Sequence, residues 1–230
     1  MLTQSSVEKI KTKKIYSLEG NIGAGKTTIL KIISNHFNNV EFIEEPVKLW
    51  KNVGGLNLLD SFYSNPKRWG FSFEFYSMLT KIQSLLKAAD SDKPIIFIER
   101  SILSNKIFID LSYELGKLGK MEYCMLLNTY DFYLHNVYPQ LSGIIYLDTP
   151  VNECIKRITK RNRDEEINIK KSYLEAIKKK LDELVHSSKM NVIRIDGLYD
   201  CEKDTVRICD NISKYLQSFN LLNSPVSKEN

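Results

Sequence analysis

The chain has 230 residues, of which 43% are hydrophobic and 27% are charged, and its formal net charge is +5. This length predicts one α/β domain that can bury a substantial core without disulfides. The apolar runs are far shorter than the roughly 20 residues of a membrane span, so we expect no membrane partner. Lysines and arginines are scattered among acidic residues, which argues against a nucleic-acid partner.

The N-terminal segment and the cysteines carry few signals. Residues 1–14 contain no secretory apolar stretch, and although they are rich in lysine they include Glu8 and no arginine. We therefore expect a short flexible leader on a cytoplasmic protein rather than an organelle presequence. The cysteines show no ligand-like pairing and are interpreted as core or surface thiols: Cys124, Cys154, Cys201 and Cys209.

Strands and helices alternate along the chain. The β-rich runs lie at 15–18, 40–43, 95–98, 143–147 and 191–195. The helical patterns lie at 26–37, 72–89, 101–118, 121–137, 150–162, 170–188 and 202–219. This alternation predicts an α/β fold, a doubly wound five-stranded parallel sheet covered by helices on both faces. We expect a single domain over 1–219 and a disordered tail over 220–230.

A glycine-rich segment joins the first strand to the first long helical pattern. It has the spacing of a phosphate-binding loop and comprises Gly20, Asn21, Ile22, Gly23, Ala24, Gly25, Lys26, Thr27 and Thr28. Glycines let backbone N–H groups turn toward phosphate oxygens, the lysine ammonium bridges the outer phosphates, and Thr27 offers a hydroxyl to Mg²⁺. The segment predicts a site for a nucleoside triphosphate and leaves the reaction open.

Acidic residues follow two of the predicted strands. Glu44 and Glu45 come after the second strand, and Glu99 with Arg100 comes after the third. Because ligands of such sheets sit at the carboxyl ends of the strands, we expect these side chains to face the same crevice as the phosphate loop. A phosphoryl acceptor needs a group that takes its proton, and Mg²⁺ needs a carboxylate. Alone, each glutamate is more typical of a solvated loop.

Several further motifs share their order and spacing with one enzyme family. They are Glu-Gly-Asn-Ile-Gly-Ala-Gly-Lys-Thr-Thr (19–28), Glu-Pro-Val-x-x-Trp (45–50), Asn-Leu-Leu-x-x-Phe-Tyr-x-x-Pro-x-x-Trp (57–69), Phe-x-x-Tyr (73–76), Glu-Arg-Ser (99–101) and Arg-x-x-x-Arg-x-Arg-x-Glu-Glu (157–166). Over nearly its whole length the chain resembles the deoxyribonucleoside kinases, which include deoxycytidine, deoxyguanosine and insect multisubstrate kinases. The resemblance implies a five-stranded parallel sheet, a homodimer, and transfer of the ATP γ-phosphate to the 5′-hydroxyl of a deoxynucleoside with Mg²⁺, in nucleotide salvage.

The resemblance also implies the catalytic roles. Glu45 corresponds to the general base for the 5′-hydroxyl, and Arg100 pairs with it and with the developing phosphate charge. Glu99 and Thr27 correspond to the groups that hold Mg²⁺, which prefers hard oxygen ligands.

In the same way, the resemblance places four residues against the acceptor. Trp50 lines the cleft for sugar and base, and Phe62 lies under the sugar. Tyr63 and Glu166 bind the 3′-hydroxyl. On pattern alone, ordinary core packing explains Trp50 and Phe62 equally well.

The segment at about 157–168 corresponds to a lid over the triphosphate donor. Arg157 and Arg163 are the expected phosphate contacts, and Arg161 is expected to stack near the donor base. Arginines on a mobile segment stabilise the transferred phosphoryl group and exclude water when both substrates are bound. Without the resemblance, an arginine-rich helix face is more typical of solvent exposure.

One residue departs from the family pattern. Where these kinases present glutamine in a Phe-Gln pair, this chain has Glu74. An ionised carboxylate only accepts hydrogen bonds, so its natural partner is the guanine edge with two adjacent donors. Lys81 lies on nearly the same helix face and could donate to guanine O6 or N7, and Asn105 stands where deoxycytidine and deoxyguanosine kinases have aspartate. Deoxyguanosine is therefore the favoured acceptor, with other deoxynucleosides as open alternatives. The alternative for Glu74 itself is that it lies on an exposed helix face, or that the register of the motif is off by one residue.

Two other functions stay open at this point. A thymidylate-type monophosphate kinase shares the sheet and the loop, but it needs extra basic groups for the acceptor phosphate and usually has Asp-Arg-Tyr or Asp-Arg-Phe in place of Glu-Arg-Ser. A non-catalytic P-loop switch is disfavoured because the chain has neither an Asn-Lys-x-Asp motif nor an Asp-x-x-Gly segment.

Overall fold

The central sheet has five parallel strands in the order β2-β3-β1-β4-β5. The computed structural model describes residues 4–199 and 203–218. The strands are β1 (Lys14–Gly20), β2 (Val40–Ile43), β3 (Ile95–Glu99), β4 (Gly143–Asp148) and β5 (Val192–Asp196). The predicted doubly wound parallel sheet is therefore confirmed.

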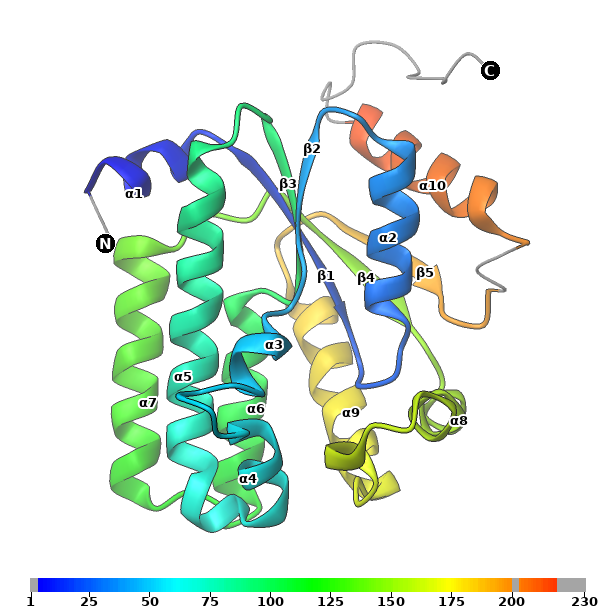
Figure 1. The fold of residues 1–230 in the computed structure, drawn as a ribbon. Coiled ribbons are helices and arrows are strands. Elements are labelled where there is room, and N and C mark those ends of the chain that lie inside the picture. The colour runs from blue at the N-terminus through cyan, green and yellow to red at the C-terminus, as the bar shows by residue number, and fades with distance from the viewer. Residues whose placement is uncertain (1–3, 200–202, 219–230) are drawn as a thin grey trace.

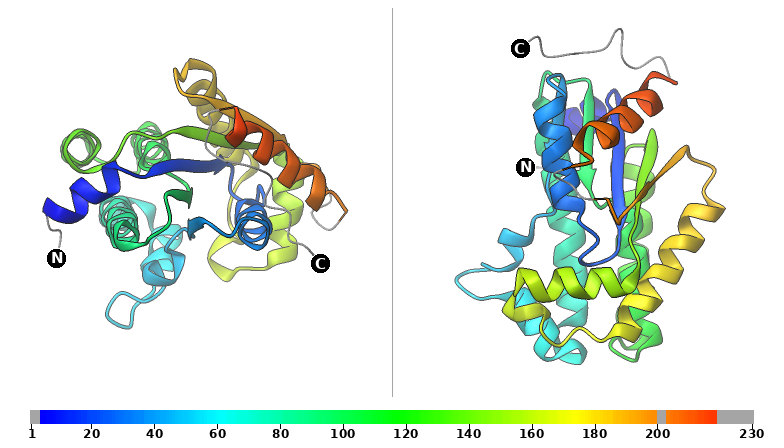
Figure 2. Two further views of the ribbon diagram at one scale, coloured as in Figure 1. Left: turned by 90° about the horizontal axis from the view of Figure 1, so that it is seen from above. Right: turned by 90° about the vertical axis from the view of Figure 1, so that its right-hand side faces the viewer.

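Helices flank the sheet on both faces, as Figures 1 and 2 show. They are α1 (Gln4–Lys11), α2 (Lys26–His36), α3 (Val47–Trp50), α4 (Leu58–Ser64), α5 (Pro66–Lys87), α6 (Ile102–Glu114), α7 (Lys120–Phe132), α8 (Val151–Arg161), α9 (Lys171–Ser187) and α10 (Thr205–Gln217). Short helical turns add η1 (Ala88–Asp90), η2 (Tyr133–Val137) and η3 (Asp164–Glu166). Among the described residues, no helix is long and apolar enough to span a bilayer.

The strands separate two hydrophobic cores. Successive side chains of a strand point to opposite faces, so Tyr16 and Leu18 of β1 enter one core while Ile15 enters the other. The first core joins the sheet to α2, α8, α9 and α10, and the second joins it to α1, α5 and α7. Since β1, β3 and β4 are buried almost throughout, the carboxyl ends of the sheet are fixed on a rigid base.

The carboxyl ends of β1 and β4 point toward the lower part of the molecule in Figure 1. There the chain leaves β1 for α2 and leaves β4 for α8, while α3 and α4 lie on the opposite side of the same edge. This is the edge at which open parallel sheets bind their ligands.

The expectation of a flexible leader is wrong for the described part of that segment. Residues 4–11 form α1, whose Ile10 is fully buried in the second core. Lys9 also pairs with Asp90 at 2.7 Å, an exposed contact that adds little stability. The burial of one isoleucine by tertiary packing thus orders a segment that is polar along most of its length.

Helices α3 and α4 were not predicted, and α5 begins at Pro66 rather than at residue 72. Asn57 caps α4 by accepting from Asp60 N, and Asn65 caps α5 by accepting from Arg68 N. Asparagine caps and a proline in the first turn are ordinary helix-start signals that the periodicity alone did not reveal.

Two smaller expectations concern the cysteines and the C-terminus. Cys154 and Cys209 are buried and Cys124 is exposed, as expected for core and surface thiols. Cys201 and the predicted disordered tail lie outside the described residues.

Candidate active site

The phosphate loop turns tightly between β1 and α2. Gly23 and Gly25 have φ angles of +75° and +102°, a region that residues with a side chain rarely adopt. A Cβ on Gly23 would lie 2.5 Å from the carbonyl oxygen of Cys154 in α8. Glycine is therefore required at this position for both its conformation and its lack of a side chain.

Lys26, the first residue of α2, lies in the loop with its ammonium buried. Its Nζ donates to the carbonyl oxygen of Asn21 at 2.8 Å. Burial, reinforced by the positive charge of Arg100, lowers the pKa of Lys26 to about 8. A bound polyphosphate would supply the negative charge that this ammonium lacks.

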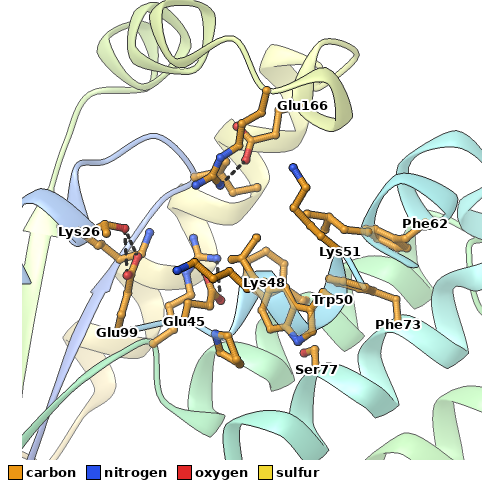
Figure 3. Close-up of a pocket in the computed structure, with 18 of the residues that line it drawn as sticks. Lys26, Glu45, Lys48, Trp50, Lys51, Phe62, Phe73, Ser77, Glu99 and Glu166 are labelled. Atoms are coloured by element: carbon orange, nitrogen blue, oxygen red, sulfur yellow. Dashed lines mark hydrogen bonds and ion pairs between the residues drawn. The ribbon is translucent and has the colours of Figure 1, made fainter. Parts of the chain in front are cut away.

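Thr27 and Glu99 meet where β3 ends beside the loop. The hydroxyl of Thr27 donates to both carboxylate oxygens of Glu99 at 2.9 Å. Both side chains line the same cavity, where Figure 3 labels Glu99. The resemblance had assigned both residues to one Mg²⁺ site, although their motifs lie more than 70 residues apart. Thr28, by contrast, is exposed and does not line the cavity.

Glu45 lies between two cations. Its Oε1 is 3.3 Å from Lys81 Nζ and 3.6 Å from Arg100 Nη1. Burial by itself would raise the pKa of Glu45, but the positive charges of Arg100, Lys81 and Lys26 outweigh it and lower the pKa to about 2. Glu45 is therefore ionised at any physiological pH, and Lys81 faces this carboxylate.

Arg100 adopts a strained backbone conformation, with φ at +60°. Its Nη2 donates to the carbonyl oxygen of Gly20 at 3.0 Å, so the guanidinium is tied to the phosphate loop. The following residue is held by a fully buried carboxylate, because Glu19 accepts from the backbone and hydroxyl of Ser101 and from the hydroxyl of Ser104. The surrounding structure thus fixes a conformation that a free arginine would avoid.

A cavity of about 420 Å³ extends from the loop toward α4 and α5. Figure 3 shows Lys26 and Glu99 at one end and the aromatic rings of Phe62 and Phe73 at the other. These two rings stack at 4.5 Å, and Trp50 meets Phe73 edge-on at 5.4 Å. The volume and the apolar walls fit a small organic ligand. Trp50 and Phe62 therefore pack against their neighbours and line the cavity at the same time.

Glu74 lines the cavity beside Phe73 and is almost completely buried. The alternative in which it lies on an exposed helix face is thus excluded. Burial raises the pKa of Glu74 to about 8, and the positive charges of Lys81 and Lys117, with the nearby hydroxyl of Ser112, reduce the shift only in part. The pKa values of two glutamates that line one cavity, Glu45 and Glu74, are therefore shifted in opposite directions.

Two predicted base contacts differ from expectation. Asn105 is buried but does not line the cavity, and its Nδ2 donates to Ser77 Oγ at 2.6 Å. Ser77 does line the cavity (Figure 3), so Asn105 acts on the lining only through this serine. Lys81 lines the cavity, but its ammonium pairs with the carboxylate of Glu45 at 3.3 Å.

Three predicted acceptor and lid residues converge above the cavity. Glu166, in η3, accepts from Arg161 and, at 3.3 Å, from Arg163. All three side chains line the cavity, and Figure 3 places Glu166 over its mouth. Tyr63 lines the same region, and burial raises its pKa, so its hydroxyl stays protonated. Arg161 therefore contacts a carboxylate in this structure.

Arg157 lies on the other side of the phosphate loop. It donates to the carbonyl oxygens of Ala24 at 2.8 Å and of Gly197 at 2.7 Å, and to Glu153 at 3.1 Å. It does not line the cavity, but it braces the loop from outside.

The sequence interpretation missed part of the site. Lining residues without an assigned role are Glu44, Lys48, Lys51, Ser77 and Tyr173. Asn57 and Glu165, just outside the cavity, hydrogen-bond to each other at 2.8 Å. Motif spacing offers no signal for such pairs, since their members come from segments far apart in the chain.

Comparisons with known proteins are consistent with this geometry. A model of the deoxynucleoside kinase family matches residues 16–217. The probable deoxycytidine kinase of Fowlpox virus (strain NVSL) is 33% identical over 205 residues, which are 86% of this chain and 85% of that protein. The deoxycytidine kinase of Homo sapiens is 35% identical over 197 residues, 75% of each chain. The mitochondrial thymidine kinase 2 of Homo sapiens is 38% identical over 166 residues, 72% of this chain and 62% of that protein.

Proposed function

Because this chain belongs to the deoxynucleoside kinase family and is an ATP-dependent nucleoside kinase, we propose that its own acceptor preference is set by Glu74 and favours deoxyguanosine. The observation that carries the proposal is the burial of Glu74 in the wall of the cavity, beside the stacked rings of Phe62 and Phe73. A polar group in that position selects among bases by the hydrogen bonds that it satisfies or leaves unmade.

The catalytic groups that we propose are Glu45 and Arg100. Glu45 is ionised and accepts the proton of the 5′-hydroxyl as the phosphoryl group is transferred. Arg100 lies between this carboxylate and the phosphate loop, where a fixed guanidinium can follow the negative charge from one to the other. The strained backbone of Arg100 supports a functional role at this position.

The groups at the end of β3 fit a magnesium ion. Thr27 and Glu99 offer adjacent hard oxygens, and among the described residues no cluster of three or more acidic, histidine or cysteine side chains competes for a metal. Mg²⁺ keeps several waters and bridges phosphates, so two protein oxygens suffice. When bound, the ion would neutralise charge on the triphosphate, while Lys26 binds its outer oxygens.

We assign the remaining predicted residues by their position. Arg163 lies over the cavity and would reach the donor phosphates once Glu166 turns to the substrate, and Arg161 would then stack near the donor base. Arg157 would hold the loop in its phosphate-binding shape as well as contact phosphate. Tyr63 and Glu166 would bind the 3′-hydroxyl, with the sugar over Phe62 and the base beside Trp50.

The preference for guanine depends on the charge of Glu74. With a pKa of about 8, the carboxyl is mostly protonated at pH 7 in the empty cavity and then presents one donor and one acceptor, as glutamine does. Ionisation at pH 7 costs about one pKa unit, or roughly tenfold in affinity, and the two guanine donors offset this cost. The preference for guanine is therefore expected to strengthen as the pH rises toward 9.

Steady-state assays with Mg-ATP and the four natural deoxynucleosides at pH 6.5 and pH 9 test the proposal. We expect deoxyguanosine to have the highest kcat/KM, and its advantage over deoxycytidine and deoxyadenosine to grow at the higher pH. A pyrimidine preference at both pH values would contradict the role of Glu74 while leaving the kinase activity intact.

We also propose a homodimer. Three exposed apolar side chains of α7, Met121, Met125 and Phe132, recur at helical spacing and form a stripe that a second copy could cover. Light scattering of the wild type should give twice the monomer mass, and Met125→Lys with Phe132→Lys should give the monomer. The single domain with a lid at about 157–168 stays a prediction. So does the cytoplasmic location, since one relative is named as mitochondrial.

A further inference from the structure

Glu165 is a buried carboxylate in the segment 161–170, most of whose residues are exposed. It lies in η3, between α8 and α9, and only 4% of its side chain is accessible. Its Oε1 accepts from Lys51 Nζ at 2.7 Å and from Asn57 Nδ2 at 2.8 Å. Both donors lie more than 100 residues earlier in the chain, on the acceptor side of the cavity. We call the side of the cavity formed by α3, α4 and α5 the acceptor wall. The contact of Glu165 therefore bridges the lid and the acceptor wall.

The neighbouring Glu166 makes the opposite set of contacts. It turns into the cavity, where it accepts from Arg161 and Arg163 of the lid itself. Two consecutive carboxylates thus divide two tasks: Glu165 attaches the lid to the acceptor wall, and Glu166 orders the cations of the lid. Because they are adjacent, a displacement of Glu165 must displace Glu166 as well.

The partners of Glu165 are themselves fixed to the acceptor wall. Lys51 directly follows the buried Trp50. Asn57 uses both ends of its amide, since Nδ2 donates to Glu165 while Oδ1 accepts from Asp60 N and caps α4. The next turn of α4 carries Phe62, whose ring lies in the cavity. A rigid path therefore runs from the aromatic wall through Asn57 to the lid.

The electrostatics agree with a permanent charge on Glu165. Burial by itself raises the pKa of Glu165, but hydrogen bonds from Lys51 and Asn57 outweigh it and lower the pKa to about 2. Charge-assisted hydrogen bonds of this kind are about twice as strong as neutral ones. The second oxygen, Oε2, is buried without a donor among the described residues, so the two bonds to Oε1 carry the whole contact.

We propose that Glu165 is a positioning residue, whose contact with Asn57 and Lys51 fastens the lid to the acceptor wall and so sets Glu166 and the lid arginines over the two substrates. The acceptor wall and the donor lid are thereby coupled: a displaced wall releases the lid, and a released lid loses its transition-state contacts. The expected effect of this contact on turnover rests on the proposed function, because it assumes the roles given to the lid residues. Its expected effect on the mobility of the lid rests on geometry alone.

Asn57→Asp is the sharpest test because it separates the two ends of the amide. An aspartate still caps α4, but it places a carboxylate against Glu165 in place of a donor. Asn65→Asp is the matched control, since Asn65 caps α5 in the same way and its side chain accepts from Arg68 N rather than contacting the lid. We expect Asn57→Asp to lower kcat/KM about tenfold or more, mainly through kcat, and Asn65→Asp to change it less than twofold.

A second substitution should restore the contact. In the double variant Asn57→Asp with Glu165→Gln, the donor and acceptor exchange sides, so we expect kcat/KM to return to within about threefold of the wild type. Lys51→Met, at a partly exposed position, should lower kcat/KM less than Asn57→Asp does. Equal losses in Asn57→Asp and Asn65→Asp, or no recovery in the double variant, would overturn the proposal.

Amide hydrogen exchange of residues 157–168 gives a readout that does not depend on turnover. With a non-hydrolysable ATP analogue and a deoxynucleoside bound, this segment should be protected in the wild type and in the double variant. It should exchange faster in Asn57→Asp, with the rest of the sheet unchanged. Equal protection of the lid in all variants would show that Glu165 does not fasten it, whatever the kinase rates are.

Discussion

The two ends of the cavity are built in different ways. At the donor end, the phosphate loop and the start of α2 come from one contiguous segment, and the backbone fixes the geometry through Gly23 and Gly25. At the acceptor end, side chains from α3, α4 and α5 meet, and aromatic stacking holds them together. A site made of backbone depends on conformation, whereas a site made of separate side chains depends on packing and on the balance of charge.

The two ends of the cavity also differ in electrostatics, as the pKa values of Glu45 and Glu74 illustrate. Glu45, near the donor end, has three cations around it and a pKa of about 2. Glu74, at the end beside Phe62 and Phe73, loses its solvent by burial, which nearby lysines offset only in part, and has a pKa of about 8. The nearby charges, rather than burial itself, therefore decide which carboxyl is ionised. One cavity thus holds a carboxylate that stays ionised and a carboxyl that is mostly protonated at pH 7.

The largest expected effect is at the donor end. Lys26→Ala removes the ammonium from the outer phosphates and should lower kcat by more than about a thousandfold, as should Glu99→Ala, which misplaces the metal. Lys31→Ala, at an exposed position of the same helix, is the control and should be near wild type. Rates measured at saturating ATP distinguish lost catalysis from weak binding. An active Lys26→Ala enzyme would be incompatible with the assignment of the loop.

The next effect tests Glu45 as the general base for the 5′-hydroxyl. Glu45→Gln should lower kcat by about two to four orders of magnitude with a small change in the KM of the deoxynucleoside. Glu44→Gln, its exposed neighbour, should change kcat little. Because the pKa of Glu45 is about 2, the acid limb of the pH profile of kcat/KM should not reflect this group at pH 4 or above. Near-normal turnover of Glu45→Gln would exclude it as the base.

A smaller effect is expected on specificity. Glu74→Gln restores a donor and an acceptor to the base edge, so relative efficiency should shift from deoxyguanosine toward deoxyadenosine or deoxycytidine by roughly ten- to a hundredfold. The amide does not titrate, so the preference should also lose its dependence on pH between 6.5 and 9. If the ranking of the four deoxynucleosides is unchanged in the variant, Glu74 does not read the base.

A separate effect is expected on stability, and its sign follows from the raised pKa of Glu74. An unfolded glutamate ionises at about pH 4.3, but folded Glu74 ionises only near pH 8, so the wild type loses stability as the pH rises between these values. Glu74→Gln removes this loss. At pH 8 the free energy of unfolding of the variant should exceed that of the wild type by about a few kcal/mol, and its Tm should be higher. Both gains should shrink at pH 5. A gain independent of pH would mean that Glu74 is not buried as an acid.

The contrast between a site made from one contiguous segment and a site made from distant side chains also explains what could be predicted from the sequence. The loop, the sheet and the pairing of Thr27 with Glu99 follow from contiguous motifs and from the rule that strand ends meet. The contact of Glu165 with Lys51 and Asn57 was missed because it joins distant segments, and no local pattern reports it. The resemblance to the family's Phe-Gln pair pointed to Glu74 as a residue of the cavity, but its protonation depends on neighbours that only the folded chain brings together.

The order of the strands has a consequence for how the chain assembles. The first three strands in the sequence, β1, β2 and β3, are contiguous in the sheet, and β4 and β5 add one after the other to the remaining side of β1. During synthesis, most of the acceptor wall is therefore complete while β1 still presents an unpaired edge. Until β4 emerges and covers it, this hydrophobic strand is open to pairing with other chains. A chain that ends before Gly143 should keep the nucleoside half of the cavity and aggregate along β1.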